Sequence, residues 1–316
     1  MMRNSDNVPM SQRSMVRQFC HQFWQDRYLH LLVLPALLYI IIFCYVPMYG
    51  IQVAFKDYSI RRGIWNSPWV GMKNFESFFN SIYFGRLIRN TVFLSVGSVL
   101  FSFPIPILFA LLLNELPVKR LRSIIQTVSY YPHFVSVVIV VGIMRILFSP
   151  ETGIINKVIV YMGGEAVAFM ESARWFRTLY FASGIWQSFG WSSIIYLAAL
   201  AGVPPELYEA AEIDGANRFR RVWHVSLPTI LPTIVILLIM ALGGVLSVGK
   251  DKILLMYNPG IYDVADVIST YVHRKSIEGG QFSFGTAVDL FNNVVNFILI
   301  VIVNYVSKRL TEISLW

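Results

Sequence analysis

Six stretches of the chain are long and apolar enough to cross a lipid bilayer, and this feature limits the possible folds more than any other. A spanning helix needs about 20 mostly apolar residues. The strongest runs are LLVLPALLYIIIFCYV, TIVILLIMALGGVL and NFILIVIVNYV. In chain order, the predicted spans are about 29–49, 88–113, 125–148, 178–201, 229–249 and 288–307.

These spans are predicted to be helices because in lipid every backbone polar group needs an internal hydrogen-bond partner. A membrane β-barrel would show alternating segments of about ten residues, and the sequence has none. The chain is 56% hydrophobic and only 14% charged, whereas soluble domains are about 25% charged. We therefore predict an all-α membrane protein with about six transmembrane helices.

The links between the spans alternate in character, which predicts how the chain lies in the membrane. The tail 1–28, the links 114–124 and 202–228 and the C-terminal end 311–316 are short, with clustered basic residues in the tail and both links, and the links 50–87, 149–177 and 250–287 are longer. Lys plus Arg is 12 on each side when Lys308 and Arg309, which follow the last predicted span, are included, but the positive-inside rule applies best to short loops. Both termini are therefore predicted to be cytoplasmic. The aromatic residues of the tail suit an interfacial helix, with a disordered tail as the alternative.

The link 202–228 reads GVPPELYEAAEIDGANRFRRVWHVSLP and predicts a short helix beside the membrane. Its two prolines can open the helix, and Gly215 can end it in a left-handed turn. One face combines small and acidic residues at helical spacing: Leu207, Ala210, Ala211 and Asp214. A second, basic helical stretch at 217–225 is predicted to stop near Pro228. From the residues alone, an ordinary amphipathic linker remains the alternative.

This link resembles the EAA loop of ABC-importer permeases, whose pattern is E-A-A, two residues, D-G-A, a spaced apolar ladder and L-P. The matching residues are Glu209, Ala210, Ala211, Asp214, Gly215, Ala216, Phe219, Leu227 and Pro228. The stretches VPMYGIQVAFKDYSI, WVGMKNFESFF and TAVDLFNNVVNFILIVIVNYVSKRLTEISLW are similar to the carbohydrate branch of that family, the permeases of the LplB type. The resemblance covers essentially the whole chain. It implies the ABC type I importer permease fold over residues 29–310.

The resemblance also implies the partners. In that family the loop is a coupling helix that docks in a groove of a cytoplasmic ATPase, and residues 209–216 would take this role here. The chain would pair with a second permease, expected as a heterodimer, with two ATPase subunits and with an external solute-binding protein. ATP and Mg would bind to the partner subunits, and this chain would bind no cofactor. The expected location is the bacterial inner membrane, which the chain crosses several times.

The sequence gives weaker support to several other functions. Residues 244–250 nearly spell a phosphate-binding loop, but Asp251 stands where Ser or Thr should hold magnesium, so the ATPase is expected on separate subunits and this chain is not expected to be an enzyme. An ion-coupled secondary carrier is the main alternative, yet no Asp or Glu lies in the middle of a predicted span. No metal-ligand spacing or basic face for nucleic acid appears, and Cys20 and Cys44 are unsuited to a disulfide.

Polar and aromatic residues inside the spans are candidates for the translocation path. Sugars suit aromatic faces together with amide and hydroxyl groups, although such residues also hold membrane helices together. The predicted path residues are Gln187, Trp191, Asn293, Tyr131 and Tyr196. The resemblance implies an oligosaccharide substrate. The excess of basic residues in the link 50–87 favours a uronate oligomer such as an alginate or pectin fragment, but docking of the binding protein would explain the same charges.

Overall fold

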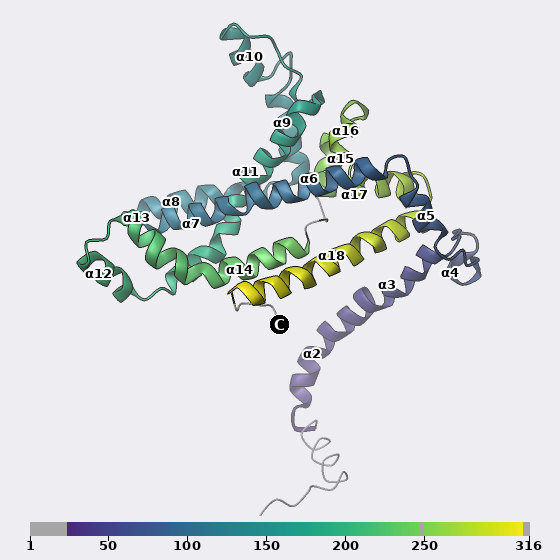
Figure 1. The fold of residues 1–316 in the computed structure, drawn as a ribbon, viewed down its shortest axis with the longest axis horizontal. Coiled ribbons are helices and arrows are strands. Elements are labelled where there is room, and N and C mark those ends of the chain that lie inside the picture. The colour runs from purple at the N-terminus through teal and green to yellow at the C-terminus, as the bar shows by residue number, and fades with distance from the viewer. Residues whose placement is uncertain (1–23, 245, 247–248, 312–316) are drawn as a thin grey trace, which may run out of the picture.

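The computed structural model describes residues 24–244, 246 and 249–311, and this part of the chain is almost entirely helical (Figure 1). Four long apolar helical segments are able to cross a membrane. They are Arg27–Phe55, Phe84–Asn114, Arg218–Gly243 and Phe282–Arg309. The predicted spans 29–49, 88–113 and 288–307 lie within three of them, and 229–249 overlaps the fourth. The all-α membrane fold is therefore confirmed.

The first two long segments are each built from several helical pieces. Arg27–Phe55 consists of α2 (Arg27–Ile40), η1 (Ile41–Tyr45), α3 (Val46–Met48) and η2 (Tyr49–Phe55). Two short helices follow, α4 (Gly63–Asn66) and α5 (Lys73–Phe79), and then α6 (Phe84–Ser102) and α7 (Pro104–Asn114). No residue of the apolar part of the first segment is buried, and Figure 1 shows α2 extending away from the rest of the bundle.

The predicted span 125–148 is not one continuous helix. It is broken between Lys119–Phe134 and Val137–Leu147, which meet at 97°. The pieces are α8 (Lys119–Tyr130), η3 (Tyr131–Phe134) and α9 (Val137–Leu147). Pro132 removes a backbone donor, Val135 is extended, and the Ser136 hydroxyl caps α9 by accepting from Ile139 N at 3.4 Å. The apolar run predicted a helix, but not the second helix start inside it.

The chain then returns through α10 (Ile154–Tyr161), η4 (Phe169–Glu171) and α11 (Ala173–Ala201). The 29-residue α11 contains the predicted span 178–201 and packs against α6, α7, α8 and α14 (Leu227–Gly243). At Gly190 a side chain would collide with the carbonyl of Ser129, so α8 and α11 touch backbone to backbone. This contact places the break in the third span directly against α11.

The predicted stop near Pro228 is wrong. After α12 (Pro205–Ile213), α13 (Arg218–Arg221) continues through the π-helix η5 (Val222–Ser226) into α14 without interruption. Pro228 lies in the first turn of α14. The wider π turn that precedes it lets the helix continue although the proline has no backbone N–H to donate. The basic stretch is thus an extension of a spanning helix rather than a separate helix.

The remaining link is a series of short helices, followed by the last long one. They are α15 (Lys250–Met256), η6 (Pro259–Ile261), α16 (Tyr262–Ala265), α17 (Ile268–Val272), η7 (His273–Glu278) and α18 (Phe282–Thr311). Figure 1 shows α12 at one end of the bundle and α4 and α5 at the opposite end. The links 50–87 and 250–287 meet at the far end, where Tyr58 N donates to Ser283 Oγ at 2.8 Å. The link 202–228 therefore lies at the opposite end of the fold from the links 50–87 and 250–287, as expected for links on opposite sides of the membrane (Figure 1).

Candidate coupling loop and translocation path

The loop predicted to couple transport to an ATPase is an exposed nine-residue helix, α12, with a tight C-terminal turn. The helix begins at Pro205, and Gly215 has a φ of +72°. Ala216 N donates to Ala211 O at 2.9 Å and Gly215 N to Glu212 O at 3.0 Å, which closes the last turn. The left-handed turn predicted at Gly215 is confirmed.

One side of α12 borders an open hollow of about 530 Å³. Its wall is made by the small face of α12 and by the turns that follow: Leu207, Ala210, Ala211, Asp214, Ala216, Arg220, His224 and Val225. Glu209 is exposed outside this wall. The residues predicted to share a face therefore do so, and the alanines leave room for another surface to approach closely.

Ion pairs tie α12 to the rest of the bundle through Arg221. Its guanidinium lies 3.0 Å from the carboxylate of Glu115, which follows α7, and 3.7 Å from that of Glu212 on α12. The side chains of Arg221 and Glu115 are only 18% and 13% exposed, so water screens this pair less than a surface pair. Sequence reasoning missed Glu115 because no local pattern relates it to a residue 106 positions later.

A hydrogen-bonded chain makes a second connection. Tyr208 on α12 shares a 3.0 Å hydrogen bond with the hydroxyl of Ser226, which is buried at the start of the fifth span. Asn114 at the end of α7 donates to the Tyr208 hydroxyl at 3.3 Å. A displacement of α12 would therefore act on two spanning segments directly.

Three of the five predicted path residues gather at the break in the third span. Gln187 on α11 donates from Nε2 to the carbonyl of Val135 at 2.7 Å. The Trp191 ring stacks on His133 with 4.5 Å between centroids and an interplanar angle of 1°. Tyr131 begins the break, and both Tyr131 and Trp191 keep much of their surface exposed. An aromatic surface with a nearby amide results, which suits a sugar ring.

The other two predicted path residues lie elsewhere. Tyr196 is 3% exposed and belongs to an apolar core with Ile107 and Ile230. Asn293 is exposed on α18. The helical period of α11 explains Tyr196, because it is offset from the face shared by Gln187 and Trp191. Because α11 is covered by other helices on several sides, residue spacing alone could not show which of its faces lines the path and which is buried in the core.

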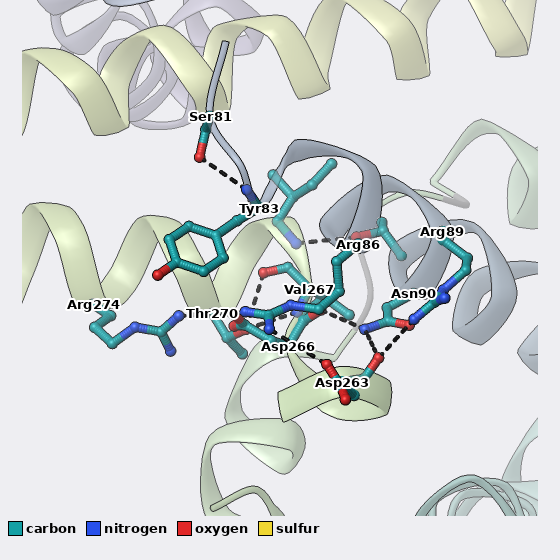
Figure 2. Close-up of polar contacts among 12 residues, drawn as sticks. Ser81, Tyr83, Arg86, Arg89, Asn90, Asp263, Asp266, Val267, Thr270 and Arg274 are labelled. Atoms are coloured by element: carbon teal, nitrogen blue, oxygen red, sulfur yellow. Dashed lines mark hydrogen bonds and ion pairs between the residues drawn. The ribbon is translucent and has the colours of Figure 1, made fainter. Parts of the chain in front are cut away.

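At the opposite end of the fold, a buried carboxylate organises the link 250–281 (Figure 2). Asp266 is fully buried and accepts from Arg274 at 2.8 Å, from Arg86 at 3.2 Å and from Thr270 Oγ1 at 2.9 Å. Asn90 on α6 donates to the carbonyls of Asp263 and Asp266 at 2.9 and 3.0 Å. These contacts fasten the link to the start of α6.

The charges of this cluster reinforce one another. Burial alone would lower the pKa of the Arg274 guanidinium, but its hydrogen bond to Asp266 and the negative charge of that carboxylate raise its pKa above the ordinary value. Arg274 therefore stays protonated throughout the physiological range. Among the described residues no group of three or more His, Cys, Asp or Glu side chains could hold a metal ion.

A bundle of apolar helices around a broken span, with a short exposed helix at one end, is the arrangement expected of a membrane-embedded transport permease. The chain belongs to the family described as "Binding-protein-dependent transport system inner membrane component", which matches residues 102–312. It is thus an inner-membrane permease of a binding-protein-dependent ABC importer. The family gives no support to the ion-coupled carrier considered from the sequence.

Two relatives from Bacillus subtilis (strain 168) match nearly the full chain. "Protein LplB" is 47% identical over 292 residues, which is 92% of each chain. "Polygalacturonan/rhamnogalacturonan transport system permease protein YteP" is 44% identical over 288 residues, 91% of this chain and 90% of the relative. The resemblance to LplB-type sugar permeases is confirmed.

A solved structure is also similar over most of the chain. It is described as a bacterial ABC transporter involved in the import of the acidic polysaccharide alginate, with a TM-score of 0.87, 41% identity and coverage of 93% of this chain and 99% of the other. A second structure of that kind, in complex with an alginate pentasaccharide-bound periplasmic protein, has a TM-score of 0.86 and 40% identity. The two likenesses support the importer fold over the whole described bundle.

Proposed function

We propose that this chain is one of two permease subunits forming the path for an acidic oligosaccharide, a uronate oligomer of the alginate or pectin type. The observation that carries the substrate class is the similarity to two transport systems whose names specify polygalacturonan/rhamnogalacturonan and alginate. Both similarities extend over about nine-tenths of the chain. Such polymers are rich in sugar carboxylates.

The charges of the link 50–87 add less to this proposal than its sequence suggested. Lys56 is buried and donates to the carbonyl of Ile64 at 2.7 Å, Arg62 pairs with Asp57 at 3.5 Å, and Arg86 pairs with Asp266. Three of the five basic side chains are thus engaged within the chain. The substrate assignment therefore depends on the relatives and on the path rather than on the net charge of this link.

The exposed first span supports the proposal of a second permease chain, because that chain would pack against it. The 29-residue segment Arg27–Phe55 has no buried residue in its apolar window and leaves the bundle. Packing against another chain would bury part of this surface, as membrane helices associate through close contact. The partner is proposed to be a similar but separate permease, with both termini of the present chain in the cytoplasm.

The driving force would come from separate ATPase subunits that bind Mg and ATP. Residues 209–216 would dock in a groove of an ATPase, with the Glu209 carboxylate meeting a basic group and the alanines allowing close approach. Motion of α12 would pass to α7 through the Arg221–Glu115 pair and to α14 through Tyr208 and Ser226. The continuous helix from Arg218 to Gly243 supports such a transmission because it joins the stretch that follows α12 to the membrane-spanning part of α14.

Inside the membrane, the sugar would pass the break in the third span. Tyr131 and Trp191 would offer ring faces to the sugar and Gln187 an amide, and Asn293, exposed on α18, would line another part of the route. A broken helix suits this role because irregular backbone at membrane depth is tolerated where it lines a polar cavity. If alanine at Gln187, Trp191 and Asn293 together leaves uptake and specificity intact, this assignment fails.

The substrate class is tested with the complete complex reconstituted in vesicles. The binding protein is supplied loaded with oligogalacturonate, with oligoalginate or with a neutral oligosaccharide of equal length, and ATP hydrolysis and uptake are measured. We expect stimulation by a uronate oligomer and little by the neutral sugar. Stimulation by neutral sugars alone would contradict the proposal, and ion-driven uptake by this chain in isolation would revive the carrier alternative.

A further inference from the structure

Lys252 is a buried cation for which the mechanism above has no role. It lies in the first turn of α15 and is 9% exposed. Its ammonium donates to the carbonyl of Tyr180 on α11 at 3.1 Å and lies 5.2 Å from the centre of that ring. A carbonyl and a ring face supply only partial negative charge, so the positive charge is not neutralised by these contacts.

No carboxylate in the described part of the chain lies within ion-pair distance of Lys252. Asp289 on α18 interacts instead with Lys250, two residues earlier, and Asp251 is exposed. Asp266, by contrast, has two arginines. A buried charge without an opposite charge is costly and is retained in membrane proteins mainly for function.

The place that Lys252 contacts on α11 lies on the same helix face as two residues of the proposed path, Gln187 and Trp191. Tyr180, Gly184, Gln187 and Trp191 follow at spacings of four, three and four residues, so they lie along one face of the helix. A Cβ on Gly184 would stand 3.5 Å from the Lys252 ammonium. The cation is therefore one helical turn from Gln187, and the missing side chain at Gly184 leaves it less covered.

The helix α15 is held firmly in this position. Ile253 and Met256 are buried in the same apolar core as Tyr180, and Arg145 on α9 donates to the carbonyl of Leu255 at 2.6 Å. A cation fixed by its neighbours loses little freedom when it binds an anion, which favours tight recognition. Lys252 lies in the link outside the spanning helices, and burial lowers its pKa to about 8, so the ammonium form predominates at neutral pH.

We propose that Lys252 is a specificity-determining residue of the path, which binds the carboxylate of a uronate unit in transit, with Gln187 and Trp191 receiving the adjoining sugar. This inference rests on the proposed function and extends it, because it assigns recognition of the acidic group to this chain as well as to the binding protein. The occupant is the substrate carboxylate. A carboxylate supplied by the second permease is the competing occupant and is distinguished by the experiment.

The experiment compares Lys252→Met and Lys252→Arg with the wild type in the complete reconstituted complex. Lys250→Met is the matched control, because Lys250 is an exposed lysine of the same helix. Uptake is measured for a uronate oligomer and for its methyl ester of equal length, each delivered by the binding protein. Thermal stability of every purified complex is measured alongside.

For Lys252→Met we expect uptake of the acid to fall about tenfold or more, the scale of one lost charge-assisted hydrogen bond. Uptake of the ester should change by less than about twofold, and Lys252→Arg should retain most acid uptake because it retains the charge. Equal losses for acid and ester, with or without lower stability, would mean pairing with protein and overturn the inference. Unchanged acid uptake would also overturn it.

The same data separate the two levels of the account. If the wild-type complex and the Lys252→Met complex take up the acid equally well, only the assignment of Lys252 is overturned. A wild-type complex that ignores the acid and takes up only neutral sugars contradicts the proposed function itself, and with it the assignment that rests on it.

Discussion

The two ends of this molecule are built in opposite ways. At one end, α12 is an exposed helix of nine residues whose shape follows from a short motif and a glycine with positive φ. At the other, the link 250–281 is fixed by a buried carboxylate that two arginines share, one of them 180 positions away in the sequence (Figure 2).

This difference teaches which parts of such a chain serve a partner and which serve the fold. A surface that meets another protein has to be displayed, so its residues are local and its contacts within the chain are few. A scaffold has to resist displacement, so its contacts are long-range and buried. We therefore expect mutations at the two ends to separate transport coupling from stability.

The largest effect is expected on stability from Asp266→Ala. This change removes the carboxylate that neutralises Arg86 and Arg274 and leaves both cations in a partly buried cluster. Breaking a buried ion pair from one side costs about 3–5 kcal/mol, so the folded permease should become much less abundant and melt at a lower temperature. Size-exclusion chromatography after heating provides the measurement.

The control for this change is Asp263→Ala in the same segment. The Asp263 side chain is 84% exposed and its carboxylate is 3.6 Å from Arg86, so removing it should cost less than about 1 kcal/mol. Equal stability losses for the two variants would show that the buried cluster is not what holds the link to α6.

The next largest effect is expected on coupling, from Gly215→Val. Val is strained by about 1–2 kcal/mol at a positive φ, which should reorient the turn that follows α12. We expect ATP hydrolysis stimulated by the loaded binding protein to fall about tenfold (about 1.4 kcal/mol) while the permease still assembles in the membrane. Glu209→Lys should uncouple similarly without backbone strain, by reversing a charge on the docking surface.

The matched control is Gly163→Val. Gly163 has a φ of +88°, and a side chain there meets open space, as it would at Gly215. The strain is comparable but lies in the link 149–177, away from the coupling loop. Full transport by the Gly215→Val and Glu209→Lys variants, or equal uncoupling by the Gly163→Val variant, would count against the docking role of α12.

A smaller effect is expected from breaking the connections behind α12. Tyr208→Phe removes a hydroxyl that contacts Ser226 and Asn114. The lost hydrogen bonds should weaken the coupling between α12 and the spanning helices by about 1 kcal/mol. Glu115→Gln and Arg221→Gln should each weaken coupling several-fold, and the double variant should lose less than the sum of the two single losses. Stimulated ATP hydrolysis is the measurement, and strict additivity would show that the two side chains do not act as a pair.

The sequence was sufficient to predict those parts of the structure that depend on residues close together in the chain. Long apolar runs predicted the spans, and the proline pair and Gly215 predicted α12 and its turn. The 97° break was missed because the stretch from 125 to 148 was read as one continuous helix, and hydropathy carries no information on helix direction. The helix that continues through Pro228 was missed because the π turn that accommodates the proline has no recognisable sequence pattern.

Within the site, the limits have the same physical origin. Glu115–Arg221 and the Asp266 cluster join residues that share no local pattern, so only folding brings them together. Tyr196 and Trp191 look alike in sequence, yet one is buried in an apolar core and the other stacks on His133. The predicted interfacial helix of the tail falls mainly on residues 1–23, which lie outside the described part of the chain, as does Cys20.

The central claim is that α12 is a cytoplasmic surface moved by an ATPase. It is tested most directly with Ala210→Cys in a chain whose own Cys20 and Cys44 are changed to serine, labelled with a membrane-impermeant thiol reagent from either side of the membrane. We predict labelling from the cytoplasmic side only, with protection and cross-linking when the ATPase subunits are assembled. Labelling from the outer side, or equal labelling with and without the ATPase, would contradict the account.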